Sequence, residues 1–184
     1  INKKILDDKY KLKVKIVGKG MNTVSLVKAT DLQVEIDRHR SESLIPYGKI
    51  FVVFDKDSFS DKEFNDAVEM CEANGYIPLW SNQAVEYWFL LHFNYVNHRM
   101  NRTEYFSKIN DCFKRKGLIY KYHKNDKDIY YKLCQYGSLE LARTNAKKIH
   151  LEHLNDRHKP SNSESCTTIY RFFDEIDERL NELK

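Results

Sequence analysis

Apolar positions along the first half of the chain predict strands and helices in alternation. Residues 50–54 are an unbroken run of β-branched and aromatic residues, typical of a strand buried on both faces of a parallel sheet. Lysines alternate with Val and Ile over residues 13–17, which predicts an earlier strand, and residues 76–80 predict a later one. Helices are expected over residues 1–10, from Asn22 or Thr23 to about Arg40, and from a capping box at Ser60–Glu63 to Gly75. This alternation is typical of an α/β fold with parallel strands.

Beyond residue 94 the apolar positions recur at helical spacing, so no further strand is predicted. A loop is expected at Pro160–Ser163, and helices over Thr103–Gly117, about Asp126–Tyr136, Ser138–Leu154 and from Ser165 onward. The apolar stripe of the last helix runs from Ile169 to Leu183. We therefore expect an α/β core over residues 1–95 and an α-helical C-terminal extension over residues 96–184, packed on that core.

Two carboxylates, Asp55 and Asp57, follow the central strand and stand two residues apart. Ligands bind outside the carboxyl ends of the strands in open α/β sheets. Both side chains can reach a common point in the loop, and carboxylate oxygens at that spacing suit Mg²⁺. In the alternative, structural interpretation, one Asp caps the following turn or helix and the other is solvated. The pair by itself leaves both interpretations open.

The helix expected over Ala84–Phe93 is apolar on nearly every side and contains one acid, Glu86. A carboxylate in such a place is costly unless it is paired, hydrogen-bonded or bound to a metal. Because this helix starts at the carboxyl edge of the sheet, we expect Glu86 on the same rim as Asp55 and Asp57. The structural alternative is an acid placed favourably near a helix N-terminus. His92 is interpreted first as a hydrogen-bonded core or rim histidine and second as a catalytic group.

Composition and charge narrow the function classes only a little. The net charge of +4 permits a polyanionic partner without requiring one. The 12 Tyr and 10 Phe would suit base stacking, although a Tyr-rich core explains most of them more simply. No two of the four cysteines form a Cys-x-x-Cys pair, which argues against zinc. Nothing in the sequence indicates disulfides, so a reducing cytoplasm is expected. No apolar run approaches the roughly 20 residues of a membrane span, and no signal peptide is seen. We expect a solvated face for His150, His153 and His158, since no acid or cysteine completes a metal set.

Three segments together resemble the RloB-like family, which belongs to the wider Toprim (topoisomerase–primase) class. They are Phe51-Val-Val-Phe-Asp-Lys-Asp57, Ser81-Asn-Gln-Ala-Val-Glu-Tyr-Trp-Phe-Leu-Leu-His-Phe93 and Cys166-Thr-Thr-Ile-Tyr170. Their order and spacing match across nearly the whole chain. The resemblance implies a Toprim-like parallel sheet flanked by helices. It also implies a Mg²⁺- or Mn²⁺-dependent nuclease of bacterial anti-phage defence, encoded at restriction or abortive-infection loci and often paired with an ATPase.

The resemblance also implies roles for individual residues. The Toprim Asp-x-Asp falls on Asp55 and Asp57, as metal ligands. Catalytic roles are implied for an acidic residue, a lysine and a histidine, namely Glu86, Lys124 and His92. Nucleic-acid contacts are implied for four polar or aromatic residues, namely Ser81, Asn82, Tyr122 and Lys124. The predicted reaction is hydrolysis of phosphodiesters in RNA, tRNA included, or in DNA.

The chain departs from the family pattern in two ways. Gln83 and Cys166 stand where the family usually has Pro. The Toprim glutamate is expected on a strand upstream of the segments above, and no residue of this sequence fills that role. Because the sequence begins with Ile1, not Met, that segment is expected either to precede it or to have been removed. The activity of this chain alone is therefore in doubt.

Two other function classes stay open. The chain could be a non-catalytic sensor or effector module that docks on a partner ATPase through its aromatic helices. A phosphotransfer domain of receiver type is a weaker reading, because it needs a Lys after a later strand and Trp80-Ser-Asn82 has none.

Overall fold

The computed structural model describes residues 16–18, 20–40 and 47–182. At its centre lies a parallel sheet of two strands, β1 (Phe51–Asp55) and β2 (Ile77–Ser81). The predicted helix over residues 1–10 and most of the predicted strand over residues 13–17 lie outside the described residues. Ile16 and Val17, which are described, belong to no regular element.

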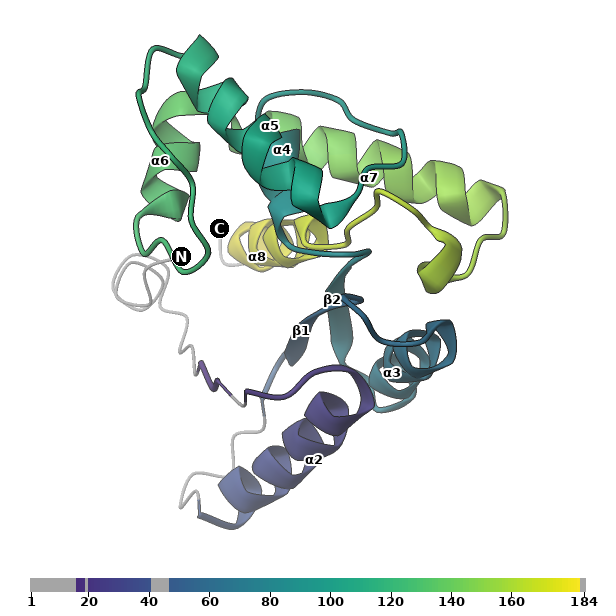
Figure 1. The fold of residues 1–184 in the computed structure, drawn as a ribbon. Helices are drawn as coiled ribbons and strands as arrows, with labels where there is room; N and C mark the ends of the chain where they lie inside the picture. The colour runs from purple at the N-terminus through teal and green to yellow at the C-terminus, as the bar shows by residue number, and fades with distance from the viewer. Residues whose placement is uncertain (1–15, 19, 41–46, 183–184) are drawn as a thin grey trace.

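The β1–α3–β2 unit follows the predicted order, with α2 (Thr23–Arg40) packed on α3 (Asp61–Ala73) along one side of the sheet (Figure 1). The predicted capping box starts α3: Ser60 N–H donates to Glu63 Oε2 at 3.0 Å, and Glu63 N–H donates to Ser60 Oγ at 3.3 Å. Gly75, at a φ of +72°, turns the chain after this helix, where a side chain would be strained. Local sequence signals therefore account for this unit.

β1 differs from the prediction because the described residues cover one of its faces and only part of the other. Val52 and Phe54 are buried, and the Phe54 ring packs on Phe64 of α3 with the ring centroids 5.7 Å apart. Val53, which points the other way, is 58% exposed. β2, by contrast, is buried along its whole length. The unbroken apolar run thus predicted a strand correctly but overstated its burial.

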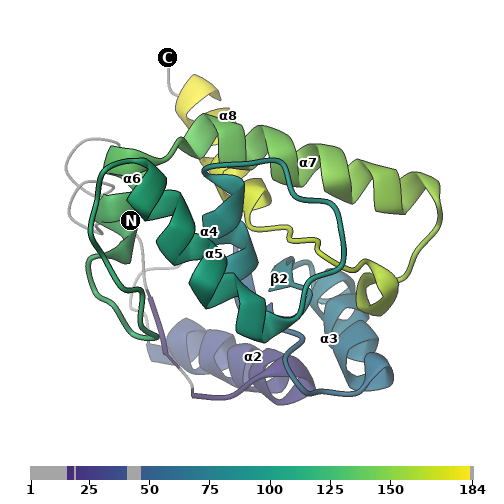
Figure 2. The same ribbon diagram turned by 45° about the horizontal axis from the view of Figure 1, so that its top comes forward.

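The rest of the chain is helical, as predicted, and forms a second layer over the sheet (Figures 1 and 2). Its elements are α4 (Glu86–Leu91), α5 (Arg102–Arg115), α6 (Ile129–Tyr136), α7 (Leu139–Asn155), the 3₁₀ turn η1 (Pro160–Asn162) and α8 (Tyr170–Glu182). α4 is shorter than expected and lies between α5 and α7. Among the fully buried side chains are Tyr87, Leu91, Tyr105, Ile109 and Phe113 from α4 and α5. None of the described helices combines the length and the apolar character that a membrane crossing requires.

The sequence predicted that the segment Ser165–Thr168 starts the last helix. In the structure this segment pairs instead with the end of β2. Thr167 forms an antiparallel bridge with Ser81, and Thr168 N–H donates to Trp80 O at 2.9 Å. The hydroxyls of Thr167 and Thr168 also donate hydrogen bonds to backbone carbonyls of β2. These contacts join residues more than 80 positions apart, so local spacing could not predict them. The described residues thus form a mixed α/β fold.

Candidate functional site

The loops that follow β1 and β2 are hydrogen-bonded to each other at the carboxyl end of the sheet. The parallel register places Asp55 opposite Ser81, so both loops leave the same edge. Lys56 N–H donates to Ser81 O at 2.9 Å, and Asp57 N–H donates to Gln83 O at 3.0 Å. Asp57 and Gln83 both have positive φ angles, 45° and 76°. Such backbone is unfavourable for residues other than glycine and concentrates at functional sites. This corner is therefore the place to look for chemistry.

Asp55 is a mostly buried carboxyl group with little compensating positive charge. Burial, as the largest cause, raises the pKa of Asp55 to about 6, and the nearby carboxylates of Glu86 and Asp57 raise it further. The Val85 N–H, which hydrogen-bonds to this carboxyl, and the charge of Arg102 oppose the shift without cancelling it. Asp55 consequently sits where an extra positive charge would be stabilised.

Glu86 is brought to the same place by the first turn of α4. Its side chain is only 2% exposed, and the Tyr122 hydroxyl donates to its Oε1 at 3.0 Å. Tyr105, from α5, is fully buried, and its hydroxyl has no hydrogen-bond partner within the described part of the chain. Burial raises the pKa of Tyr105 to about 12, with further contributions from Glu86 and Asp55, so this hydroxyl lies within electrostatic reach of both carboxyls.

Asp57 is arranged differently from the other two acids. Its carboxylate forms an ion pair with the guanidinium of Arg102, the first residue of α5. The sequence predicted a helix from Thr103, whereas the structure starts it one residue earlier, with Asn101 as the N-cap and Glu104 completing a capping box. Arg102 escaped notice in the sequence, although the Asn101-x-x-Glu104 spacing marks the helix start and so marks Arg102 as its first residue.

The donors at this corner suit a divalent cation, although they form an incomplete set. In the part of the chain that the structure describes, no group of three His, Cys, Asp or Glu side chains is placed to hold a metal ion. Mg²⁺, however, is commonly held by one or two carboxylates together with waters and substrate phosphates. Asp55 and Glu86 are mutually repulsive oxygen donors, and the Tyr105 hydroxyl adds an oxygen that has no hydrogen-bond partner among the described residues. These residues fit Mg²⁺ in chemistry and charge, whereas Asp57 is committed to Arg102.

Comparison with known proteins identifies the relationship. The model of the RloB-like protein family matches residues 2–176. The chain belongs to the RloB-like family. No curated protein and no solved structure has a significant match to it. The three segments that carry the resemblance meet in space: residues 51–57 and 81–93 contain the two strand ends and α4, and residues 166–170 pair with the end of β2.

The loop between α5 and α6 places a basic surface beside the carboxylates of the RloB-like chain. Tyr122 is 6% exposed and fixes the loop to Glu86, while Lys124, two residues on, is exposed. The next turn is held by Asp126, which accepts hydrogen bonds from Tyr120 Oη and Lys132 Nζ. These bonds lower the pKa of Asp126 to about 2, although its partial burial acts in the opposite direction. Tyr122 is thus a positioning contact that ties the loop carrying Lys124 to Glu86.

Ser81 and Asn82 are buried in the RloB-like chain and use their side chains within the fold. Ser81 Oγ lies 3.0 Å from Thr167 Oγ1. Asn82 Nδ2 donates to the carbonyls of Pro160 and Ser161 at 3.1 and 3.0 Å. At 1% and 3% exposure, both side chains fasten the C-terminal segment to the strand end. A contact between either side chain and nucleic acid stays a prediction, and it would require these bonds to open.

His92 has the environment of a core histidine. It is 5% exposed, its Nδ1 lies 3.0 Å from the Trp88 carbonyl oxygen, and its ring packs edge-on against Trp88. Burial lowers the pKa of His92 to about 4, so the ring is neutral near pH 7 and Nδ1 donates to the carbonyl. Gly137 packs so closely on His92 that a side chain at position 137 would not fit, because its Cβ would lie 2.8 Å from the His92 Cβ. A catalytic role for His92 stays a prediction without a supporting contact in this structure.

The sequence predicted a solvated face for the histidines near the end of α7, but the structure does not leave all of them solvated. His150 packs against Trp80 and contacts the Tyr170 hydroxyl at 2.9 Å, and burial lowers its pKa to about 4. His153 and His158 contact each other through their Nδ1 atoms at 2.9 Å. The prediction therefore fails for His150, because the C-terminal segment folds back over it.

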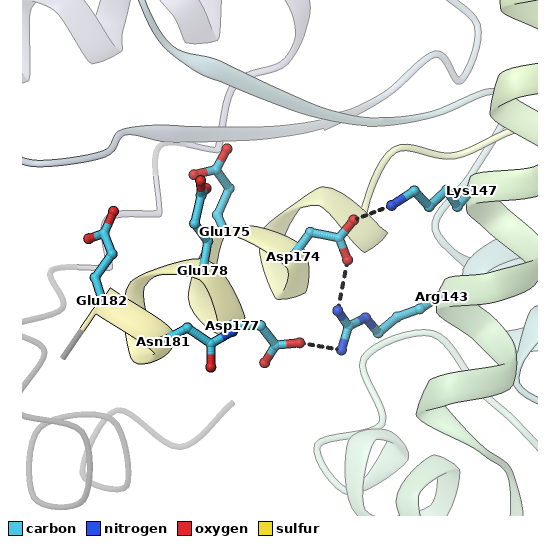
Figure 3. A pocket seen from close by; sticks show the side chains of 8 residues that line it. All are labelled: Arg143, Lys147, Asp174, Glu175, Asp177, Glu178, Asn181 and Glu182. Atoms are coloured by element: carbon cyan, nitrogen blue, oxygen red, sulfur yellow. Dashed lines mark hydrogen bonds and ion pairs between the residues drawn. The ribbon is translucent and has the colours of Figure 1, made fainter. Parts of the chain in front are cut away.

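A second acidic cluster lines an open hollow between α7 and α8 (Figure 3). Arg143 points between two of its acids and donates to Asp174 at 2.8 Å and to Asp177 at 2.7 Å. Lys147 adds a contact of 3.3 Å to Asp174. Glu175 and Glu178 point away from Arg143, and Glu175 pairs with Lys49 at 3.0 Å. Because three cations, two from α7 and one from the segment before β1, already pair with these acids, the cluster is explained by packing α8 on α7.

Proposed function

We propose that this RloB-like protein is a Toprim-class nuclease that hydrolyses phosphodiesters in RNA, tRNA included, or in DNA with the aid of Mg²⁺ or Mn²⁺. We further propose that it acts as a toxic effector in bacterial anti-phage defence. The observation that supports the reaction most directly is the pair of neighbouring carboxyls at the carboxyl end of a parallel sheet. Glu86 is buried, and Asp55 is half-buried with its pKa raised to about 6. Family membership supports the setting.

The proposed roles follow from the position of each side chain. A divalent cation, when bound, would neutralise phosphate charge and activate water. Asp55 would hold the cation, and Glu86 would complete the site or accept the proton of the attacking water. Tyr122 orients Glu86 by donating to Oε1, and Lys124 would contact the scissile or adjacent phosphate.

The charge distribution supports a polyanionic substrate. Residues 102–128 contain eight Lys and Arg against four Asp and Glu, a surplus equal to the whole net charge of +4. This segment comprises α5 and the loop that Tyr122 ties to Glu86. Exposed lysines in it, Lys121, Lys124 and Lys127 among them, would neutralise phosphates beside the carboxylates.

The metal requirement is tested separately from cleavage. Mn²⁺ binding is measured by isothermal titration for the unchanged chain, Asp55→Asn and Glu86→Gln. Loss of one carboxylate ligand is expected to weaken binding by roughly tenfold or more. Asp174→Asn in the α8 cluster is the matched control, because it removes the same charge from a neutralised acid. Equal Mn²⁺ affinity in all four proteins would contradict the metal assignment.

Cleavage is then measured in the full-length protein with labelled single-stranded RNA, tRNA and DNA, each with Mg²⁺ or with EDTA. We expect Mg²⁺-dependent products that Asp55→Asn removes and Asp174→Asn leaves intact. Cleavage that persists in Asp55→Asn would refute the proposed role of this carboxylate.

One observation favours the second candidate, a non-catalytic module that docks on a partner ATPase. An apolar groove runs between α2, the exposed face of β1 and α8, and side chains such as Val53, Phe172 and Ile176 line it. A pure docking module would show no thermal shift with Mg²⁺ or Mn²⁺. A shift that Asp55→Asn abolishes would favour the nuclease.

A further inference from the structure

Arg102 is the cation that the structure brings into an ion pair with the candidate carboxylates. It reaches Asp57 from the start of α5, 45 residues further along the chain. Lys56, which follows Asp55 in the chain, is turned toward the start of α3, where its Nζ pairs with Asp61 at 2.9 Å. Lys124 is exposed on the loop beyond Tyr122. A guanidinium is thus already held at the rim of the proposed phosphodiester site.

The contact between Arg102 and Asp57 is of a kind that exchanges easily. Both side chains are accessible, at 39% and 38% exposure. Ion pairs this exposed contribute little to stability, because water screens both charges. A phosphate oxygen offers a guanidinium the same bidentate, charge-assisted hydrogen bonds as a carboxylate. Replacing the Asp57 carboxylate by a phosphate would therefore cost Arg102 little.

A second group on the same helix face belongs to this wall of the site. Tyr105 stands three residues after Arg102, so both project from the same side of α5. Its hydroxyl is fully buried and lacks a hydrogen-bond partner among the described residues. A buried hydroxyl without a partner is costly, which points to a ligand oxygen that completes it. The start of α5 thus offers a cation and a spare hydroxyl beside Asp55 and Glu86.

We propose that Arg102 binds a phosphodiester oxygen of the nucleic acid and that its ion pair with Asp57 is the resting arrangement. When phosphate takes the guanidinium, the Asp57 carboxylate is released toward the cation site formed by Asp55 and Glu86. This proposal rests on the proposed function and deepens it, because it assigns the residue that recognises the phosphate. It also explains why Asp57 is paired with a cation while its two neighbours repel each other.

Binding is measured by fluorescence anisotropy with labelled single-stranded RNA and DNA in EDTA, over a series of salt concentrations, so that cleavage does not interfere. Arg102→Gln is expected to weaken binding by roughly tenfold and to reduce the log–log salt slope by about one. Arg102→Lys, which keeps the charge without the bidentate fork, should fall between the two. Arg99→Gln is the matched control, because Arg99 is 74% exposed and pairs with Glu164, which is not one of the candidate carboxylates.

The partner of the ion pair provides the opposite test. Asp57→Asn frees Arg102, so the RNA affinity in EDTA should rise by roughly threefold or more. The control is Asp111→Asn, which removes an exposed acid from α5 itself and should change affinity less. A purely structural ion pair predicts that Arg102→Gln and Asp57→Asn weaken binding together. Asp57→Asn therefore distinguishes the proposal from a purely structural ion pair even if Arg102→Gln folds poorly.

The outcomes separate the two proposals. If the unchanged chain binds and cleaves nucleic acid while Arg102→Gln binds equally well with the same salt slope, the role of Arg102 is refuted and the nuclease stands. If binding depends on Arg102 as described but no divalent ion produces cleavage in the full-length protein, the nuclease is refuted and the phosphate site stands. Failure of the full-length protein to bind RNA or DNA at low salt overturns both.

Discussion

Two acidic clusters of this protein look alike in sequence and differ in their electrostatics. In the α8 cluster, Asp174 and Asp177 share Arg143, and the acids remain partly exposed to water. At the strand end, Glu86 is buried and Asp55 is half-buried, and the guanidinium of Arg102 pairs with Asp57 instead of with either of them. The first arrangement lowers the energy of the fold, whereas the second raises it. An acid that the fold leaves uncompensated is the better candidate for binding a cation or moving a proton.

The largest expected effect concerns activity. Glu86→Gln keeps the size and the Tyr122 contact of the side chain but removes its charge, so Mg²⁺-dependent cleavage should fall by roughly 100-fold or more. Glu178→Gln in the α8 cluster should leave the cleavage rate unchanged. Initial rates on one labelled RNA at saturating Mg²⁺ measure both variants. An equal loss of cleavage in both variants would show that the rate depends on the total charge of the protein and not on the carboxylate of Glu86.

The next effect is on stability, and it runs opposite to the effect on activity. Because the pKa of Asp55 is raised from 3.8 to about 6, the folded state binds this proton more tightly than the unfolded state. The contribution of Asp55 to stability is therefore full below about pH 3.8 and is lost as the pH rises through about 6. Asp55→Asn should thus stabilise the protein above pH 6, by up to about 3 kcal/mol, and gain little near pH 4.

Urea unfolding of both proteins at pH 4 and pH 7.5 measures this difference. The comparison between proteins matters because His92 and His150, whose pKa values are lowered to about 4, weaken the fold as the pH falls from 6.5 to 4. That common loss cancels when Asp55→Asn is subtracted from the unchanged chain. A variant that is destabilised at pH 7.5 would show that Asp55 is satisfied inside the fold.

A smaller effect is expected from removing the shared cation of the α8 cluster. Arg143 is 21% exposed and pairs with two acids, so Arg143→Gln should destabilise the protein by about 1–2 kcal/mol, and less at high salt. Thermal unfolding at 0.05 and 1 M NaCl would measure the loss. A variant as stable as the unchanged chain would remove the contrast between the clusters.

The smallest effect belongs to Lys147. Its side chain is 57% exposed and meets Asp174 at 3.3 Å, so Lys147→Gln should cost about 0.5 kcal/mol or less. The same unfolding assay applies, with Lys108→Gln as an exposed control on α5. A loss as large as that of Arg143→Gln would mean that the cluster depends on its total charge and not on the geometry of the guanidinium.

The strand-end acids could be predicted because the signals that place them are local. A run of apolar residues predicts β1, the acids at its end follow from chain order, and the capping box at Ser60 starts α3. Glu86 was found because an acid in an apolar helix start needs a partner, and the structure supplies Tyr122. Arg102 was missed because its pairing with Asp57 depends on how α5 is placed, which no local pattern records.

The amino-acid sequence by itself determined the β1–α3–β2 unit, the helical second half and the position of the carboxylates at the strand end, since hydrophobic period and capping act over a few residues. Only the tertiary structure decided which acids are neutralised and where Ser165–Thr168 pairs. It also decided that the polar side-chain atoms of Ser81, Asn82 and His92 form hydrogen bonds within the fold. The physical reason is that burial and charge compensation depend on groups far apart in the chain. Two acids with the same neighbours in sequence can therefore have opposite energies once the chain has folded.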